Sequence, residues 1–315
     1  MKRGLIQWDR AELPPAAFDA RLASFDVTMA EYDVPVLVIY TDVWRSNDVR
    51  YASNYMPYWN RAFSVVPRKE KPILLCSLSP RVYPWIKSVT IHETIVASPS
   101  LPVQLAKLCT ERGWTRVGIV DHAGLPNDLY TQLAVEKFNV VDIPRSAFRP
   151  APTPAEISMH RRAAQMARDV LATELNAHAV GHTDHALAGS LERKLRRAGA
   201  EDVVLLVSNG HHAPRSPSGG LVDPYFSVIV ALEYCGHWAK VGRNLAGAEC
   251  TLPPAPDTRV HRETLSGNYA WQGIDDQDAT LDAVVSVQIE VVRDGRRLFC
   301  GDTFLQSRGG GVQVL

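Results

Sequence analysis

The chain has 315 residues, of which 46% are hydrophobic and 22% are charged, a composition typical of a globular protein with material for two domains. Its 34 basic residues balance its 34 acidic residues, so no net charge attracts nucleic acid or an anionic membrane surface. Five scattered cysteines without a CxxC pair argue against disulfides and structural zinc, and no segment resembles a signal peptide or a membrane span, so we expect a cytoplasmic protein.

The first half of the chain alternates apolar runs with helical patterns, which predicts an α/β domain around a mainly parallel or mixed sheet. In chain order we expect a strand at 34–40, a helix at 48–55, strands at 62–66 and 72–77, a helix at 102–112, and strands at 116–120 and 139–142. Gly113 is the stop signal for the helix before it. Residues 1–148 are therefore predicted to form the N-terminal domain.

A proline-rich segment marks the domain boundary. Pro150, Pro152 and Pro154 lack backbone donors and disfavour helix in the residues before them, which predicts a linker and a second domain at 149–315. Thr153 can then cap a long amphipathic helix with Glu156 in its first turn.

The second domain is predicted to place helices before strands. A second helix begins near Thr183 and ends at Gly199. Strand-like segments follow at 203–208, 225–232, 283–292 and 298–305. This order favours an α+β domain with helices packed on a curved, largely antiparallel sheet.

Four segments carry a resemblance to a known family. GHTDHALAGSLERKLRRAGAEDVVLLVSNGHHAPRSP at 181–217 resembles the central stretch of creatinase and the proline peptidases, and RPAPTPAEISMHRRAAQMARDVLA at 149–172 resembles their domain junction. DVRYASNY at 48–55 and VVSVQIEVVRDGRRLFCGDTFL at 284–305 resemble their N-terminal domain and closing strands. The chain thus resembles the creatinase/aminopeptidase P family, which implies a creatinase-like N-terminal domain and a C-terminal pita-bread domain.

The metal ligands of that family do not appear at the matching positions. Metal-dependent members use two Asp, one His and two Glu, whose oxygen and imidazole donors suit a pair of divalent cations. Ile229 and Lys240 match the two Asp, and Gln288 and Gly301 match the two Glu. The segment 241–287 is too short for the loop that carries the family's His, so the resemblance implies an internal deletion. We expect no metal and no cofactor.

His212 is the candidate acid/base group. It matches the His that creatinase, which works without metal, uses as a proton shuttle, and an imidazole titrates near neutral pH. The alternative is a turn residue whose ring only bonds a backbone carbonyl. Creatinase's catalytic carboxylates match Gly242 and Gln288, so the partners that His212 needs are absent.

Substrate binding is assigned to six residues, namely His211, Lys240, Arg243, Gln288, Tyr55 and Trp59. Lys240 can replace the lost metal charge, and Arg243 can hold an anionic group or instead pair with an acid such as Glu233. Tyr55 and Trp59 belong to an aromatic set that can line a ligand mouth, pack in the core or form a dimer contact.

The segment His182–Asp184–His185 suggests metal ligation by its spacing, although helix capping and exposure explain it better.

Three functions follow from these residues. The first is a metal-independent, creatinase-like hydrolase or lyase that cleaves a C–N bond in a small polar or anionic molecule. The second is a non-catalytic pita-bread protein that serves as a binding module or partner subunit. The third, a metal-dependent Xaa-Pro aminopeptidase, needs ligands that the sequence does not show. The resemblance implies a homodimer with a small-molecule ligand, and neither nucleic acid nor membrane is an expected partner.

Overall fold

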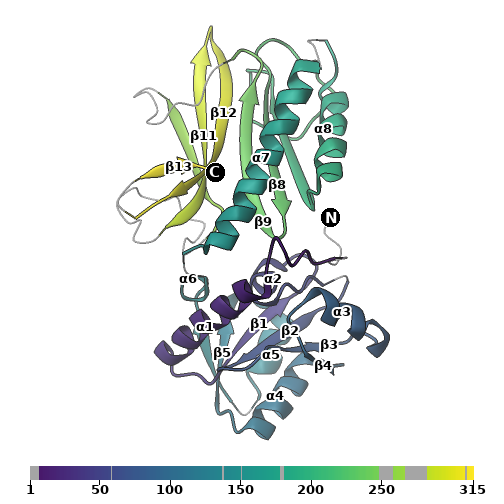
Figure 1. Ribbon diagram of the computed structural model, residues 1–315, viewed down its shortest axis with the longest axis vertical. Helices are drawn as coiled ribbons and strands as arrows, with labels where there is room; N and C mark the ends of the chain where they lie inside the picture. Colours follow the sequence, from purple (N-terminus) through teal and green to yellow (C-terminus); the bar gives the residue numbers. More distant parts are fainter. Residues whose placement is uncertain are drawn as a thin grey trace. The chain divides into compact units, whose positions relative to one another are not determined.

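The computed structural model describes residues 7–57, 59–136, 138–149, 151–177, 181–247, 258–266, 282–308 and 311–315. The chain divides into two compact units, Met1–Pro150 and Ala151–Leu315, and the sequence places the boundary after residue 148. Each unit contains one large sheet with helices (Figure 1). No helix in the described part of the chain is long and apolar enough to cross a membrane.

The N-terminal unit is built on a six-stranded mixed sheet of order β4-β3-β2-β1-β5-β6. Its strands are β1 (Val36–Thr41), β2 (Ala62–Pro67), β3 (Ile73–Cys76), β4 (Thr94–Ala97), β5 (Arg116–Val120) and β6 (Asn139–Ile143). Its helices are α1 (Pro15–Glu31), α2 (Asn47–Ser53), α3 (Tyr83–Val89), α4 (Leu101–Arg112), α5 (Asn127–Leu133) and α6 (Arg145–Phe148), with short 3-10 turns at Pro80–Val82 and His122–Gly124. The pairing of β1 with β5 is parallel and that of β1 with β2 is antiparallel, as a mixed sheet requires.

Helices cover both faces of this sheet, and all six residues of its central strand β1 are buried, the first four of them aliphatic. Leu37 and Ile39 of β1 belong to a core shared with α1 and α2, whereas Val36 and Val38 belong to a core shared with α4 and α5. A strand that is buried on both faces reads as a continuous apolar run rather than as an alternation. This confirms the α/β class predicted for the first half.

A buried polar cluster joins the end of α3 to strand β2. Ser64 and His92 are fully buried, and the Ser64 hydroxyl lies 2.9 Å from Nε2 of His92. The other ring nitrogen of His92 lies 3.3 Å from the hydroxyl of Thr90. Burial lowers the pKa of His92 from its ordinary 6.5 to about 3, because the charged imidazolium loses its hydration. The ring is therefore neutral in the folded protein at neutral pH.

This buried imidazole predicts an acid-sensitive stability. His92 takes up a proton below about pH 6.5 in the unfolded chain but only near pH 3 in the folded chain. The free energy of unfolding therefore does not depend on His92 above pH 6.5, and it falls as the pH drops from 6.5 toward 3. The slope contributed by one such group reaches about 1.4 kcal/mol per pH unit. His92→Gln should lower the slope of unfolding free energy against pH, measured by urea unfolding between pH 7 and pH 4. Ser64→Ala is the control, since it keeps the buried imidazole and should keep the slope. Equal slopes in wild type and His92→Gln would contradict the assignment.

The C-terminal unit contains a seven-stranded sheet in which every described pairing is antiparallel. The order is β10-β11-β12-β9-β8-β7, and β13 also pairs with β12. The strands are β7 (Asp202–Ser208), β8 (Ser227–Tyr234), β9 (His237–Asn244), β10 (Arg259–Thr264), β11 (Ala283–Arg293), β12 (Arg296–Gln306) and β13 (Val312–Val314), and the helices are α7 (Pro154–Ala177) and α8 (Asp184–Ala198). This confirms the predicted α+β class.

Both helices begin on signals that the sequence contains, and α8 also ends on one. Glu156 accepts hydrogen bonds from the backbone N–H of Thr153 at 3.0 Å and from its hydroxyl, so these residues form a reciprocal cap at the start of α7. Thr183 caps α8 through the N–H of Ala186, and Gly199 ends it with a φ of 111°.

The two faces of the C-terminal sheet differ because side chains alternate along each strand. Ala239 and Val241 of β9 pack against the α7 residues Ala163 and Ala167 in one apolar core. The residues between them, beginning with Lys240, therefore point to the opposite face. We call this the far face, meaning the side of the C-terminal sheet turned away from α7 and α8.

Candidate functional site

The four positions that the resemblance matches to metal ligands, Ile229, Lys240, Gln288 and Gly301, all lie on the far face. Strand register places Ile229 of β8 opposite Gly242 of β9, Gly242 opposite Gly301 of β12, and Gly301 opposite Gln288 of β11. Three of the four positions thus share one row that crosses the sheet. The fourth, Lys240, lies on β9 in the next row along.

The side chain of Gln288 lies flat across its neighbours in this row. Its Nε2 donates to the backbone carbonyl of Lys240 at 3.4 Å and to the Ser286 hydroxyl at 3.2 Å. Its Oε1 lies closer than 3.0 Å to the point that a Cβ would occupy on Gly242 and on Gly301. Gln288 can adopt this position only because both neighbours lack a side chain.

The carboxamide of Gln288 is sealed from solvent. The residue is 3% exposed, and among the described residues its Oε1 has no hydrogen-bond partner. The groups that it faces are the Cα–H groups of Gly242 and Gly301, which are weak donors at most. The Gln288 carboxamide therefore fills the space over Gly242 and Gly301.

Lys240 spans the neighbouring row. Its backbone exchanges hydrogen bonds with the Thr303 hydroxyl on β12, and Thr303 pairs with Ser286 of β11. Ser286 pairs in turn with Glu263 of β10, and Nζ of Lys240 reaches Oε2 of Glu263 at 2.7 Å. The small hydroxyl residues leave room for the long side chain. The Lys240 charge is thus balanced by a carboxylate from a distant strand.

These residues do not fit a pair of divalent cations. Ile229 and Gly301 offer no side-chain donor, Gln288 is neutral and buried, and Lys240 is itself a cation. Among the residues that the structure describes, no group of three His, Cys, Asp or Glu side chains is arranged to hold a metal.

The structure holds His212 through its backbone and through one ring nitrogen. The Ser208 hydroxyl donates to the His212 carbonyl at 2.6 Å, and Nδ1 of the ring lies 2.8 Å from the carbonyl of Ala213. Within the described part of the chain neither bond involves a carboxylate. Nε2 of the adjacent His211 instead contacts the guanidinium of Arg296. The turn geometry that the sequence left as an alternative for His212 is present.

Arg243 lies on the other face of the sheet from Lys240 and Gln288. Being three residues after Lys240 on β9, it points toward α7, where its guanidinium bonds Asp302 at 2.8 Å. The second oxygen of Asp302 bonds Arg168 of α7 at 2.7 Å. The partner acid is thus Asp302 and not Glu233, which corrects the alternative drawn from the sequence.

The two aromatic candidates belong to the N-terminal unit. Tyr55 is 2% exposed and packs in the core beneath α1 and α2, and burial is the main cause that raises its pKa. Its hydroxyl bonds Asn60 at 3.4 Å. Trp59 is 64% exposed. Tyr55 therefore has a core position, and Trp59 presents its ring at the surface of its unit.

The sequence indicates Asp184 only as a metal ligand or as an exposed capping residue, whereas the structure buries it at 4% exposure. Asp184 begins α8, where the sequence indicated capping, but Thr183 provides the cap. The Asp184 carboxylate instead accepts the backbone N–H groups of Ser218 and Gly219 at 3.0 and 2.7 Å. No local pattern predicts this contact, because the two segments are more than 30 residues apart.

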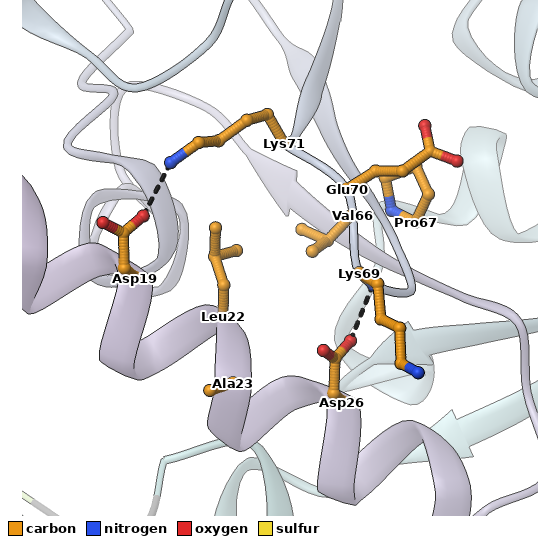
Figure 2. A pocket seen from close by; sticks show the side chains of 9 residues that line it. All are labelled: Asp19, Leu22, Ala23, Asp26, Val66, Pro67, Lys69, Glu70 and Lys71. Carbon is orange, nitrogen blue, oxygen red and sulfur yellow. Dashed lines mark hydrogen bonds and ion pairs between the residues drawn. The ribbon is translucent and has the colours of Figure 1, made fainter.

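A separate hollow of about 270 Å³ lies in the N-terminal unit between α1 and the turn from β2 to β3 (Figure 2). Its walls carry charges that pair within it. Lys71 bonds Asp19 at 2.6 Å, and the backbone N–H of Lys69 bonds Asp26 at 2.9 Å. None of the residues predicted for the site lines this hollow.

Known structures share this fold over nearly the whole chain. A Xaa-Pro dipeptidase from Bacillus anthracis aligns with a TM-score of 0.67 at 13% identity, covering 94% of this chain and 97% of its own. An X-Pro aminopeptidase from Thermotoga maritima aligns with a TM-score of 0.69 at 12% identity, covering 93% of this chain and 96% of its own. A prolidase from Pyrococcus furiosus aligns with a TM-score of 0.66 at 13% identity, covering 93% of this chain and 98% of its own. No protein-family model and no curated protein matches the chain.

These similarities confirm the pita-bread fold that the resemblance implied. The internal deletion stays a prediction. Residues 248–257 and 267–281, where it would fall, lie outside the described residues.

The packing of Gln288 predicts which glycine substitutions can be rescued. Gly242→Ala places a methyl group on Oε1 of Gln288, and such overpacking costs about 1–3 kcal/mol of unfolding free energy. In the Gln288→Ala background the same substitution should cost less, because the 2.4 Å contact with Oε1 is gone and the tightest one left is 3.2 Å, to the backbone nitrogen of Gly301. Gly301→Ala is the matched control, since its Cβ would also meet the backbone carbonyl of Val287 and should stay destabilising in both backgrounds. Urea unfolding of the six proteins measures this. A cost for Gly242→Ala that is equal in both backgrounds would contradict the packing.

Proposed function

We propose that this protein is a metal-independent enzyme that cleaves a C–N bond in a small polar or anionic molecule, by hydrolysis or lyase-type chemistry like that of creatinase. His212 is the proposed acid/base group. The replaced ligand positions support metal independence, since the far face offers a paired ammonium and a buried carboxamide where carboxylates are needed.

The hydrogen bond of His212 to Ala213 carries the proposal. A carbonyl oxygen can only accept, so Nδ1 of a neutral ring must hold the proton in that bond. Nε2 is then the nitrogen with the lone pair, and it is the atom that can take a proton from water or substrate. The backbone bond therefore does the part of the orienting work that a carboxylate does in many His-based sites.

The proposed substrate-binding role of Lys240 rests on its ion pair on the far face. Lys240 is 23% exposed and Glu263 is 41% exposed, so an anionic substrate can compete with Glu263 for the ammonium. His211 stays in the proposed set, whereas the enclosed and 3% exposed Gln288 carboxamide gives its predicted contact with substrate no support. No described contact joins His212 to Lys240, Gln288, Arg243, Tyr55 or Trp59, so the binding role of these residues remains a prediction.

A non-catalytic binding module or partner subunit is the second candidate. It is favoured because among the described residues the hydrogen bonds of His212 go only to backbone carbonyls and the Ser208 hydroxyl, so no carboxylate assists the ring. The homodimer that the resemblance implies remains a prediction.

The first test concerns metal. Protein purified from cells grown with Mn, Co and Zn should contain none of these metals in stoichiometric amount, as measured by inductively coupled plasma mass spectrometry. Any activity found should be unchanged by a chelator, because no cation takes part in the chemistry. A stoichiometric metal whose removal abolishes activity would overturn the proposal in favour of the peptidase.

The second test concerns His212. A thermal-shift screen of small amides, amidines and amino acids should give a stabilising ligand, since binding at 100 times the Kd adds about 2.7 kcal/mol. If that ligand is turned over, His212→Ala should slow the reaction about 10²- to 10⁴-fold, the usual contribution of one acid/base group. Product formation measured by mass spectrometry reports this.

His122→Ala in the N-terminal unit is the matched control and should keep the wild-type rate. Ligand binding without turnover in wild type would favour the binding module. Full turnover in His212→Ala would remove the acid/base role.

A further inference from the structure

The segment that carries His212 is a long connection without helix or strand. It runs from Asn209 to Val222 between β7 and β8, with Pro214 and Pro217 and three glycines among its residues. Such a segment has many conformations to choose from, and ordering it is costly in entropy. Its contacts therefore decide where the imidazole of His212 lies.

The near end of this connection is held by β7. Val207 and Arg215 exchange both of their backbone hydrogen bonds, at 2.7 and 3.0 Å. The Ser208 hydroxyl accepts from the N–H of Gly210 at 3.2 Å and donates to the carbonyl of His212. The residues around His212 are thus closed into a compact turn.

The far end is held by α8. Asp184 is 4% exposed, and its two oxygens accept the N–H groups of Ser218 and Gly219. Its own N–H donates to the carbonyl of Gly220 at 2.8 Å. Burial alone would raise the pKa of Asp184, but the backbone donors outweigh it and the pKa is lowered. A charged acceptor binds N–H groups more strongly than a neutral one.

We propose that Asp184 is a positioning residue for His212. Its carboxylate fixes residues 218 and 219, and the Arg215–Val207 pair transmits that restraint to the turn that aims the ring. The carboxylate is free for this work because Thr183 caps the helix. The importance of the role rests on the proposed function of His212, but the restraint itself can be measured without a substrate.

The test compares Asp184→Asn with wild type by NMR. Losing the charge on this acceptor should raise hydrogen exchange of the Ser218 and Gly219 amides about tenfold or more. Long-range ¹H–¹⁵N spectra should show His212 leaving the single Nδ1–H form for a mixture of tautomers. Asp184→Glu keeps the charge and should restore part of the wild-type signature. Glu192→Gln, on the same helix and away from the connection, is the matched control and should change neither reading.

Two outcomes would overturn the inference. If exchange at Ser218 and Gly219 rises while the His212 spectrum stays that of wild type, Asp184 only anchors the chain. If neither reading changes, the contact is not a restraint. Should Asp184→Asn fail to fold, Asp184→Ser keeps one acceptor oxygen and gives the same comparison. A changed His212 spectrum in a protein that shows no turnover would support the positioning role and count against the proposed function, so the two can fail separately.

Discussion

The far face depends on one packing constraint, which is that Gln288 occupies space left by two glycines. Its carboxamide crosses β12 and reaches β9, and this path exists only because Gly301 and Gly242 have no Cβ. The three residues are therefore linked, because a side chain at Gly242 or Gly301 would have to displace the Gln288 carboxamide.

Side chains of β9 alternate between the two faces of the C-terminal sheet, so its two basic residues lie on opposite faces. Lys240 points to the far face and is balanced by Glu263, whereas Arg243 points to α7 and shares Asp302 with Arg168. A paired ammonium on the far face cannot hold cations, yet it can exchange its partner for an anionic group. The two basic residues look alike in sequence but belong to different environments.

The histidine connection shows how a flexible segment can acquire a definite shape. Backbone pairing at Val207, the Ser208 hydroxyl and the Asp184 carboxylate hold it at separate points. His212 then owes its tautomer to the carbonyl of Ala213 rather than to an acidic side chain. Within the described residues this ring is oriented by backbone and has no carboxylate bonded to it.

By itself, the sequence determined the fold class and the helix caps at Thr153, Thr183 and Gly199, because these depend on local spacing and residue type. It did not predict helix α1, which starts on prolines without a polar cap, or strand β4, whose four residues are too few for a clear alternation. Only the tertiary structure decided that Lys240 meets Glu263, that Gln288 covers the glycines, and that Asp184 holds residues 218 and 219. Those partners come from strands and loops far apart in the chain. Strand register and burial determine which residues meet, so no local sequence pattern predicts these contacts.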